Sequence, residues 1–272
     1  MEYIIITLVV LLIILILCII YSCNKVGVSY YEISDEKIDK DMKIMLLSDL
    51  HNRNIKEKLD IIIKNENPDM IILSGDMVNE FPHEQQNFID LTDLFTGYST
   101  YYTFGNHEEA LSEHLRSLFL RKLTRTNVVL LNNNSKKISE NIMLYGLDVD
   151  ITFFEGLRKK KINNEYIESK IGKLDKDKYN IAIAHNPLMA KEYNEFGFDL
   201  SLGGHVHGGI IRLPLLGGIL SPEYKFFPKY YQGVYNVGKM KLVVSRGLGY
   251  NRRLPIRLFN PSEVVVIKLS KK

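Results

Sequence analysis

Hydrophobic residues fill the beginning of the chain almost without a break. From Ile4 to Ile20 every residue is apolar except Thr7, and the tyrosines Tyr3 and Tyr21 flank the run. Aromatic residues are common at membrane–water interfaces. A helix over this run, rising ~1.5 Å per residue, is long enough to cross a ~30 Å hydrocarbon core. The pattern therefore predicts one N-terminal transmembrane helix, and a buried core helix is a poor alternative because the run is apolar on every side.

A cleaved signal peptide is the stronger alternative to a retained anchor. Such a signal needs a basic segment before its apolar run, and the residues that precede Tyr3 are not basic. We therefore expect an uncleaved anchor over residues 1–23, a juxtamembrane segment over 24–42 and a globular domain over 43–272. Lysines follow the apolar run and none precedes it, which weakly favours a cytoplasmic domain and leaves the side of the membrane open.

Beyond the anchor, short apolar runs alternate with segments of helical spacing. Strands are expected at Lys43–Ser48, Asp69–Ser74, Thr100–Phe104, Val128–Leu131, Ile138–Leu147, Asn180–Ala184, Asp199–Leu202, Met240–Ser245 and Val264–Leu269. Helices are expected at Lys56–Asn67, Glu84–Thr96, Glu108–Thr126 and Glu155–Ile171. Alternation of strands and helices followed by further strands predicts an α/β fold with mixed sheets.

Composition narrows the class of protein. The 272 residues are 46% hydrophobic and 25% charged, an ordinary globular balance that excludes a disordered or low-complexity chain. With only two cysteines, a disulfide framework and a cysteine-rich zinc module are excluded. The net charge of +3 and the pI near 8.6 lack a strong basic excess, so no nucleic-acid partner is expected. Nothing in the sequence indicates an oligomeric state.

Polar residues follow the ends of the apolar runs. Because ligands of open α/β sheets collect at the carboxyl ends of strands, these residues are expected to form one site. Five of the seven histidines lie in these segments. The segments are Asp49-Leu50-His51, Gly75-Asp76, Gly105-Asn106-His107-Glu108, His185-Asn186-Pro187 and Gly204-His205-Val206-His207.

Imidazole nitrogens and carboxylate oxygens together suit a hard or borderline divalent ion. Two such ions ~3.5–4 Å apart can clamp the attacking and leaving oxygens of a phosphoryl displacement and lower the pKa of a bound water to give hydroxide near neutral pH. A carboxylate must bridge such a pair, and Asp76 is the natural candidate because it lies in the middle of the set.

This ordered set of motifs resembles the calcineurin-like metallophosphoesterase superfamily, over about Lys43 to Leu269. The tail, with Ser245–Gly249 followed by Leu254–Arg257, is similar to a bacterial membrane-associated phosphodiesterase branch, which includes enzymes that split a lipid pyrophosphate. The resemblance implies a four-layer α/β/β/α sandwich of two mixed sheets. It also implies two divalent metal ions, commonly Mn²⁺, Fe²⁺ or Zn²⁺.

The resemblance also implies individual roles at the site. Asp49, His51 and His207 would bind the first metal, and Asp76 would bridge both ions. The second would be completed by Asn106, His185 and His205. His107 would be the catalytic residue, which protonates the leaving oxygen or holds a phosphate oxygen.

One departure from the resemblance concerns phosphate recognition. In the protein phosphatases of the superfamily an Asp-Arg pair follows the Gly-Asp motif, whereas Asn79-Glu80 stands here, which argues against a protein phosphatase. An arginine elsewhere is then needed to grip phosphate, since guanidinium suits bidentate phosphate contacts. The candidates are Arg246, Arg252 and Arg253.

The sequence thus favours a membrane-anchored, metal-dependent phosphodiesterase or pyrophosphatase acting on a phosphoester, with a lipid-linked substrate suggested by the anchor. The alternatives are a nuclease or cyclic-nucleotide phosphodiesterase, and a non-catalytic membrane scaffold that keeps metals for structure. Leu213–Phe227 is apolar and broken by Pro and Gly, and we expect an irregular loop that covers the site or contacts lipid.

Overall fold

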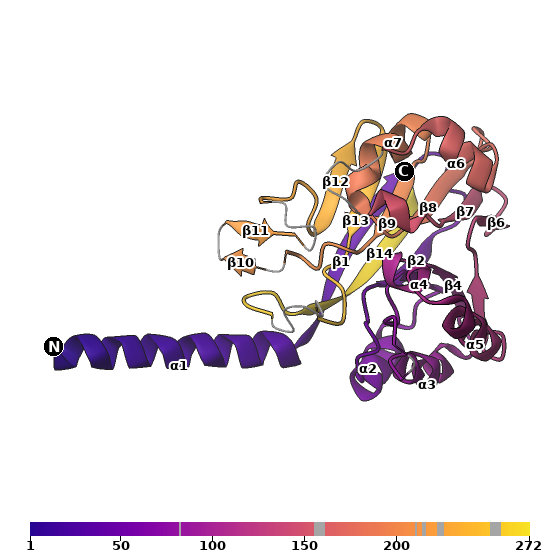
Figure 1. The fold of residues 1–272 in the computed structure, drawn as a ribbon. Helices are drawn as coiled ribbons and strands as arrows, with labels where there is room; N and C mark the ends of the chain where they lie inside the picture. Colours follow the sequence, from indigo (N-terminus) through magenta and orange to yellow (C-terminus); the bar gives the residue numbers. More distant parts are fainter. Residues whose placement is uncertain (82, 155–160, 210, 214–215, 222–225, 251–256) are drawn as a thin grey trace.

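Two six-stranded mixed sheets form the centre of the body (Figure 1). The structure is a computed structural model that describes the whole chain except residues 82, 155–160, 210, 214–215, 222–225 and 251–256. The strand order of the first sheet is β1-β14-β2-β3-β4-β5, and that of the second is β12-β13-β9-β8-β7-β6. A separate two-stranded hairpin consists of β10 (Ile211–Leu213) and β11 (Gly217–Leu220).

Strands β2 to β5 of the first sheet are mutually parallel, and β14 runs antiparallel to β2 and parallel to β1. In the second sheet β7, β8, β9 and β13 are parallel, with the antiparallel strands β6 and β12 at the edges. The bounds are β1 Val26–Asp35, β2 Met42–Leu47, β3 Met70–Ser74, β4 Ser99–Thr103, β5 Val128–Leu130, β14 Ser262–Lys271, β6 Asn134–Lys137, β7 Ile142–Leu147, β8 Tyr179–Ala184, β9 Leu200–Gly203, β12 Gly233–Val237 and β13 Met240–Val244.

The helices cover the outer faces of the sheets. One group packs on the first sheet: α2 (Lys56–Glu66), α3 (Gln86–Leu91), η1 (Thr92–Phe95) and α5 (Glu113–Leu123). The second sheet is covered by α6 (Asn164–Ile171) and α7 (Ala190–Phe196). The short α4 (Asn106–Glu109), η2 (Ile151–Phe153) and η3 (Pro187–Met189) follow strand ends.

Alternation along β2 explains why the sheets are sandwiched. Met45 and Leu47 face the helices α2 and α3, whereas Ile44 and Leu46 face the second sheet and meet Ile181 and Ile183 of β8. Successive side chains of a strand point to opposite faces, so a strand buried on both sides is apolar throughout. The predicted four-layer α/β/β/α sandwich of two mixed sheets is thus confirmed.

Several element boundaries differ from the sequence expectations. The helix expected over Glu108–Thr126 is divided into α4 and α5, because Ser112 caps a new helix by accepting a hydrogen bond from Leu115 N. The strand β6 and the helix α7 were not expected. Of the helix expected over Glu155–Ile171, residues 161–163 are not helical and α6 begins at Asn164, while residues 155–160 lie outside the described residues.

The segment 24–42, assigned from the sequence to a juxtamembrane stretch, contains β1. All ten residues of β1 pair in parallel with β14, from Val26 opposite Ser262 to Asp35 opposite Lys271. The folded body therefore begins at β1, well before residue 43. The partly polar, partly exposed pattern of β1 gave no continuous apolar run by which the strand could be recognised.

Helix α1 (Glu2–Asn24) extends from the body (Figure 1). It is the one helix of the described chain that is long and apolar enough to cross a membrane, with a mean hydropathy of 3.5, and its span is not buried in the body. A signal sequence has the same length and composition.

Candidate metal centre

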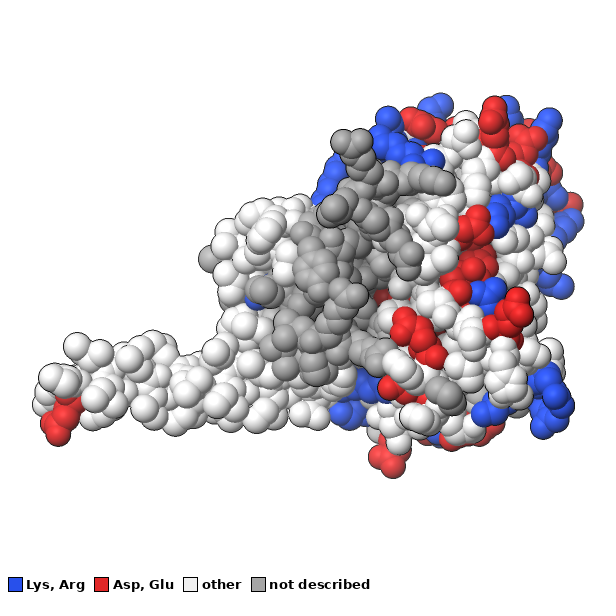
Figure 2. Space-filling view, viewed as in Figure 1, with Lys and Arg blue, Asp and Glu red and all other residues white. Residues whose placement is uncertain are grey.

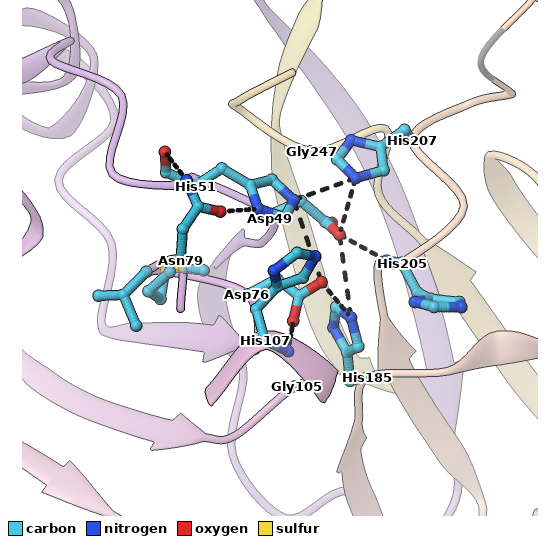
Figure 3. Close-up of polar contacts among 12 residues, drawn as sticks. Asp49, His51, Asp76, Asn79, Gly105, His107, His185, His205, His207 and Gly247 are labelled. Carbon is cyan, nitrogen blue, oxygen red and sulfur yellow. Dashed lines mark hydrogen bonds and ion pairs between the residues drawn. The ribbon is translucent and has the colours of Figure 1, made fainter. Parts of the chain in front are cut away.

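Five strand ends bring the candidate residues to one edge of the sandwich (Figure 3). Asp49 and His51 follow β2, Asp76 follows β3, and His107 follows β4 in the first sheet. The second sheet contributes the remaining histidines, with His185 after β8 and both His205 and His207 after β9.

The backbone turns sharply at most of these residues. Asp49, His51, Asp76, His205 and His207 all have positive φ angles, between 48° and 65°. Such a conformation is uncommon outside glycine, and it clusters at functional sites where the surrounding structure holds it in place. Here the turns let neighbouring side chains of one loop point into the same space.

Asp49 lies at the centre of the arrangement and is fully buried. Its Oδ1 accepts a hydrogen bond from the backbone N–H of His205 at 2.8 Å and lies 3.6 Å from Nε2 of His207. Its Oδ2 is buried without a hydrogen-bond partner among the described residues. Burial raises the pKa of Asp49 to about 6, because the charged carboxylate is removed from water.

His51 and His207 face one another. Their Nε2 atoms are 3.2 Å apart, and the rings stack with centroids 5.0 Å apart. Burial lowers the pKa of His51 to about 4. Burial and the neighbouring His51 lower the pKa of His207 well below its usual range. Two neutral imidazoles that turn nitrogens toward each other form a pair of electron donors for a cation.

Asp76 connects the two halves of the site. Its Oδ1 accepts a hydrogen bond from the backbone N–H of His107 at 2.9 Å, and its Oδ2 lies 3.0 Å from Nε2 of His185 and 4.0 Å from Nε2 of His51. Burial would raise the pKa of Asp76, but His185 and His107 hold it well below the usual range.

His185 and His107 are held in different ways. His185 donates from Nδ1 to the carbonyl oxygen of Ser74 at 2.8 Å, which turns Nε2 toward Asp76. His107 Nδ1 lies 3.2 Å from Oε1 of Glu80. Burial lowers the pKa of both rings, but the charge of Asp76 outweighs it. The pKa of His185 is raised to about 10, and that of His107, which Glu80 also raises, to about 9.

His205 lies on the side of the site that His185 occupies. Asn106 is the first residue of α4, and its Oδ1 is buried without a hydrogen-bond partner among the described residues. The ring of His205 lies edge-on to that of His185 at 5.1 Å and to that of Phe154 at 5.3 Å. Phe154 therefore forms an apolar wall beside this half of the site.

Two supporting residues were not identified from the sequence. The carboxylate of Glu108, fully buried, accepts backbone N–H bonds from Asp76, Met77, Val78 and Gly105 at 2.6–3.1 Å. Asn79, noted above only as a departure from the phosphatase motif, accepts a hydrogen bond from Nδ1 of His51 at 2.8 Å. The position of Glu108 in the Gly-Asn-His-Glu motif at the start of α4 could have indicated its role. The role of Asn79 could not be inferred in this way, because its partner His51 lies at another strand end.

The donor atoms gather into groups that fit metal ions. Three sets of ligand atoms each lie within 4.8 Å of one another: Asp49, His51 and His207; His51, Asp76 and His107; and Asp76, His185 and His205. The unpartnered Oδ2 of Asp49 and Oδ1 of Asn106 add acceptors that a cation would satisfy. Buried polar atoms normally have partners, so these orphan oxygens fit a metal centre.

The arginines considered for phosphate binding are placed differently. Arg246 lies 3.2 Å from Oε1 of Glu263 in a nearly buried ion pair, so its charge is already matched. Arg252 and Arg253 lie outside the described residues. Arg257, in the same tail, is buried and donates to the carbonyl oxygens of Arg246, Gly247, Gly249 and Asn260.

Comparison with known proteins agrees with this geometry. Residues 42–209 match the family model of the calcineurin-like phosphoesterases. The chain belongs to the calcineurin-like phosphoesterase family. The resemblance inferred from the strand-end motifs is therefore confirmed, and the match ends immediately after the Gly-His-Val-His-Gly-Gly loop. The family is metal-dependent, in agreement with the clustered His and Asp side chains.

Relatives of this calcineurin-like phosphoesterase occur in several bacteria. The chain is 31% identical to an uncharacterized metallophosphoesterase of Campylobacter jejuni, over 86% of this chain and 61% of that protein. It is 26% identical to the uncharacterized metallophosphoesterase YkuE of Bacillus subtilis, over 82% of this chain and 75% of YkuE. It is 27% identical to the phosphodiesterase YaeI of Escherichia coli, over 84% and 82% of the two chains. The chain thus spans about three fifths of the Campylobacter protein.

Proposed function

We propose that this chain is a membrane-anchored, metal-dependent phosphohydrolase of the phosphodiesterase or pyrophosphatase type, with a dinuclear metal site. The observation that carries the proposal is the pair of ligand groups that share Asp76: one group lies on the His51 side and the other on the His185 side. A two-metal centre is the arrangement best suited to phosphoester cleavage by in-line displacement. The 27% identity to a protein named as a phosphodiesterase supports the reaction type.

In this proposal Asp49, His51 and His207 hold the first ion and Asp76 bridges. The remaining ligands, Asn106, His185 and His205, hold the second. When bound, two divalent ions of the Mn²⁺, Fe²⁺ or Zn²⁺ type supply Lewis acidity and lower the pKa of a water molecule. Two hydrogen bonds orient the histidine ligands. The side chain of Asn79 turns Nε2 of His51 inward, and the backbone carbonyl of Ser74 does the same for Nε2 of His185.

His107 is the proposed general acid. Its ring is partly exposed and lies edge-on to His51 at 4.7 Å, so it borders the site while remaining accessible to substrate. In the metal-free protein, Asp76 and Glu80 raise its pKa to about 9. A protonated imidazole beside the leaving oxygen can donate that proton as the bond to phosphorus breaks.

The experiment uses the full chain in detergent, stripped of metal and reloaded with Mn²⁺, Zn²⁺ or Fe²⁺. Hydrolysis of bis(p-nitrophenyl) phosphate is compared with that of the p-nitrophenyl monoester. We expect metal-dependent diester cleavage that falls at least 100-fold in Asp76→Ala, through loss of the bridging ligand, and in His107→Ala, through loss of the general acid. His114→Ala is the matched control, because His114 is exposed on α5.

The outcomes separate the alternatives. A strong preference for the monoester contradicts the phosphodiesterase assignment. Preferred cleavage of DNA, RNA or a cyclic nucleotide supports the nuclease or cyclic-nucleotide phosphodiesterase. A folded chain that binds two ions and cleaves none of these substrates, nor a phospholipid diester, supports the non-catalytic scaffold.

The membrane part of the proposal rests on α1. Its mean hydropathy of 3.5 and its lack of burial in the body suit a hydrocarbon environment. An anchor holds the site close to substrates that cannot leave the bilayer, so we propose a lipid-linked phosphoester as substrate. A full chain that cleaves phospholipid or lipid-linked diesters no better than water-soluble esters would contradict this assignment.

A further inference from the structure

Apolar side chains are exposed around the hairpin β10–β11. Phe226 is 74% exposed and Phe227 is 64% exposed, and Leu216 and Leu213 of the hairpin are exposed as well. Single exposed apolar residues are ordinary on soluble proteins, but adjacent large ones mark a surface that meets another apolar phase. This surface needs a partner that the described body does not provide.

The hairpin and α1 extend from the same side of the body (Figure 1). In the space-filling view, charged side chains are concentrated on the right-hand part of the body, whereas α1 beyond its N-terminal end and most of the described atoms at the left edge of the body are uncharged (Figure 2). The apolar hairpin therefore lies on the side of the body that an anchored chain turns toward the bilayer.

A groove joins α1 to the body at the same end. Its volume is about 430 Å³, and its lining combines Ile14, Leu17, Cys18, Tyr21 and Ser22 of α1 with Phe259 and Pro261. Ile14, Leu17 and Cys18 belong to the apolar span, and Tyr21 and Ser22 follow its end. With α1 in a bilayer, Phe259 is consequently level with the last turns of the span and borders the acyl chains.

The end of α1 is held against the body by several hydrogen bonds. The carbonyl oxygen of Cys23 accepts from the Arg53 guanidinium and from the Tyr250 hydroxyl, the latter at 2.9 Å. Lys58 Nζ donates to the carbonyl oxygen of Asn24 at 2.7 Å. These bonds attach the C-terminal end of α1 to the body.

The metal centre lies directly behind this face. Asn260, next to Phe259, donates its side-chain amide to the carbonyl oxygens of His207 at 2.6 Å and of Gly209 at 3.1 Å. Strand β10 begins at Ile211, and four residues of chain span at most about 14 Å. The exposed apolar residues therefore border the loop that carries His207.

We infer that Leu213, Leu216, Phe226, Phe227 and Phe259 form an apolar lip that inserts into the bilayer surface beside α1. The occupant of this surface is the acyl region of membrane lipids, and the lip draws the edge of the metal site down to the headgroup level. The inference rests on the proposed anchoring by α1 and adds a second membrane contact, through which a phosphoester in a lipid headgroup reaches the site without leaving the bilayer.

Tryptophan reporters test the lip, because the chain contains no tryptophan of its own. The full chain is reconstituted into phosphatidylcholine vesicles with and without brominated acyl chains, which quench nearby tryptophans. Phe227→Trp and Leu216→Trp report on the lip, and Leu12→Trp reports on α1. Leu118→Trp, at an exposed position of α5, is the control for the remote surface.

The lip predicts strong quenching and blue-shifted emission for Phe227→Trp and Leu216→Trp, as for Leu12→Trp, and no quenching for Leu118→Trp. Quenching of Leu12→Trp alone would overturn the lip and leave the anchor intact. If Leu12→Trp is not quenched either, the anchoring itself fails.

A second measurement tests the consequence for substrate. The double variant Phe226→Ser, Phe227→Ser is assayed on a phosphodiester carried by vesicle lipids and on bis(p-nitrophenyl) phosphate. We expect at least a tenfold loss on the vesicle substrate and a change of less than twofold on the soluble one. Equal losses on both substrates, or none on either, would contradict a role in membrane contact.

Discussion

Asn79 forms hydrogen bonds with both the ring and the backbone of His51. Its Oδ1 accepts a hydrogen bond from Nδ1 of the ring at 2.8 Å, and its amide donates to the carbonyl oxygen of the same residue at 3.2 Å. Because an amide oxygen only accepts, Nδ1 must carry the proton, and Nε2 presents its lone pair to the centre of the site. One side chain therefore determines both the tautomer and the direction of a candidate ligand.

The variant Asn79→Ala should lower metal affinity about 10- to 100-fold, the usual effect of removing the partner that orients a ligating histidine. Competition of the protein with a metal-binding dye measures this affinity. Asn79→Asp is the matched control, because it keeps an oxygen acceptor for Nδ1 and should retain affinity within a few-fold. Equal affinities for Asn79→Ala and the unsubstituted chain would show that Asn79 does not orient His51.

Glu108 is predicted to stabilise the folded state. Its carboxylate satisfies four buried N–H groups, those of Asp76, Met77, Val78 and Gly105. Glu108→Ala leaves these donors without partners and should lower the free energy of unfolding by about 3–5 kcal/mol in urea titrations.

Glu108→Gln, which keeps one accepting oxygen, should be less destabilised. Glu113→Ala, on the exposed first turn of α5, should change the free energy of unfolding by less than about 0.5 kcal/mol. Similar unfolding curves for Glu108→Ala and Glu113→Ala would contradict this account of the loop after β3.

Gly204 leaves no room for a side chain. A Cβ at this position would lie 2.2 Å from Oδ2 of Asp49 and 2.5 Å from Oγ of Ser48, well inside contact distance. Gly204→Ala should therefore displace the Asp49 carboxylate and reduce the bound metal, measured by elemental analysis of the reloaded protein. Gly27→Ala is the control, since its Cβ would meet nothing closer than 3.8 Å. Full metal content in Gly204→Ala would be incompatible with Asp49 as a ligand.

Asp148 is expected to make stability depend on pH. Burial and the nearby Glu109 raise its pKa from 3.8 to about 8. Between these values the folded state keeps a proton that the unfolded state releases, so this group lowers stability as pH rises from about 4 to 8.

Asp148→Asn removes that proton linkage and keeps a side-chain oxygen for the amide of Asn132, which donates to it at 2.9 Å. The variant should be more stable than the unsubstituted chain by about 1–3 kcal/mol at high pH, with a smaller difference near pH 5. Urea unfolding at both pH values measures this. A difference that does not grow with pH would mean that Asp148 titrates normally.

The central strands and the residues at their ends were predictable because they depend on local signals. Buried runs such as that of β8 are apolar throughout, and a strand end with Asp49 or His185 needs no knowledge of distant contacts. The edge strands β1 and β6 were not predictable in this way, because their exposed, polar residues resemble loop. Their positions depend on pairing with β14 and β7.

The residues that support the site could not be predicted from the sequence, for a related reason. Asn79 contacts His51 across two strand ends, and Asn260 reaches His207 from the far end of the chain. Such contacts exist only after the sheets have formed, so motif spacing contains no trace of them. Likewise the segment expected to be an irregular loop over Leu213–Phe227 includes the end of β10 and the whole of β11, which begins with two glycines rather than with an apolar alternation.

The pairing of β1 with β14 has a consequence for how the molecule is made. Val26 of β1 pairs with Ser262 of β14, so the two strands lie far apart in the sequence. During synthesis β1 therefore leaves the ribosome long before β14 is made. Strand β1 therefore has no partner while the rest of the sandwich is synthesised. Long-range pairing of this kind forms late and slowly. Closure of the first sheet is therefore expected to be the last step of folding.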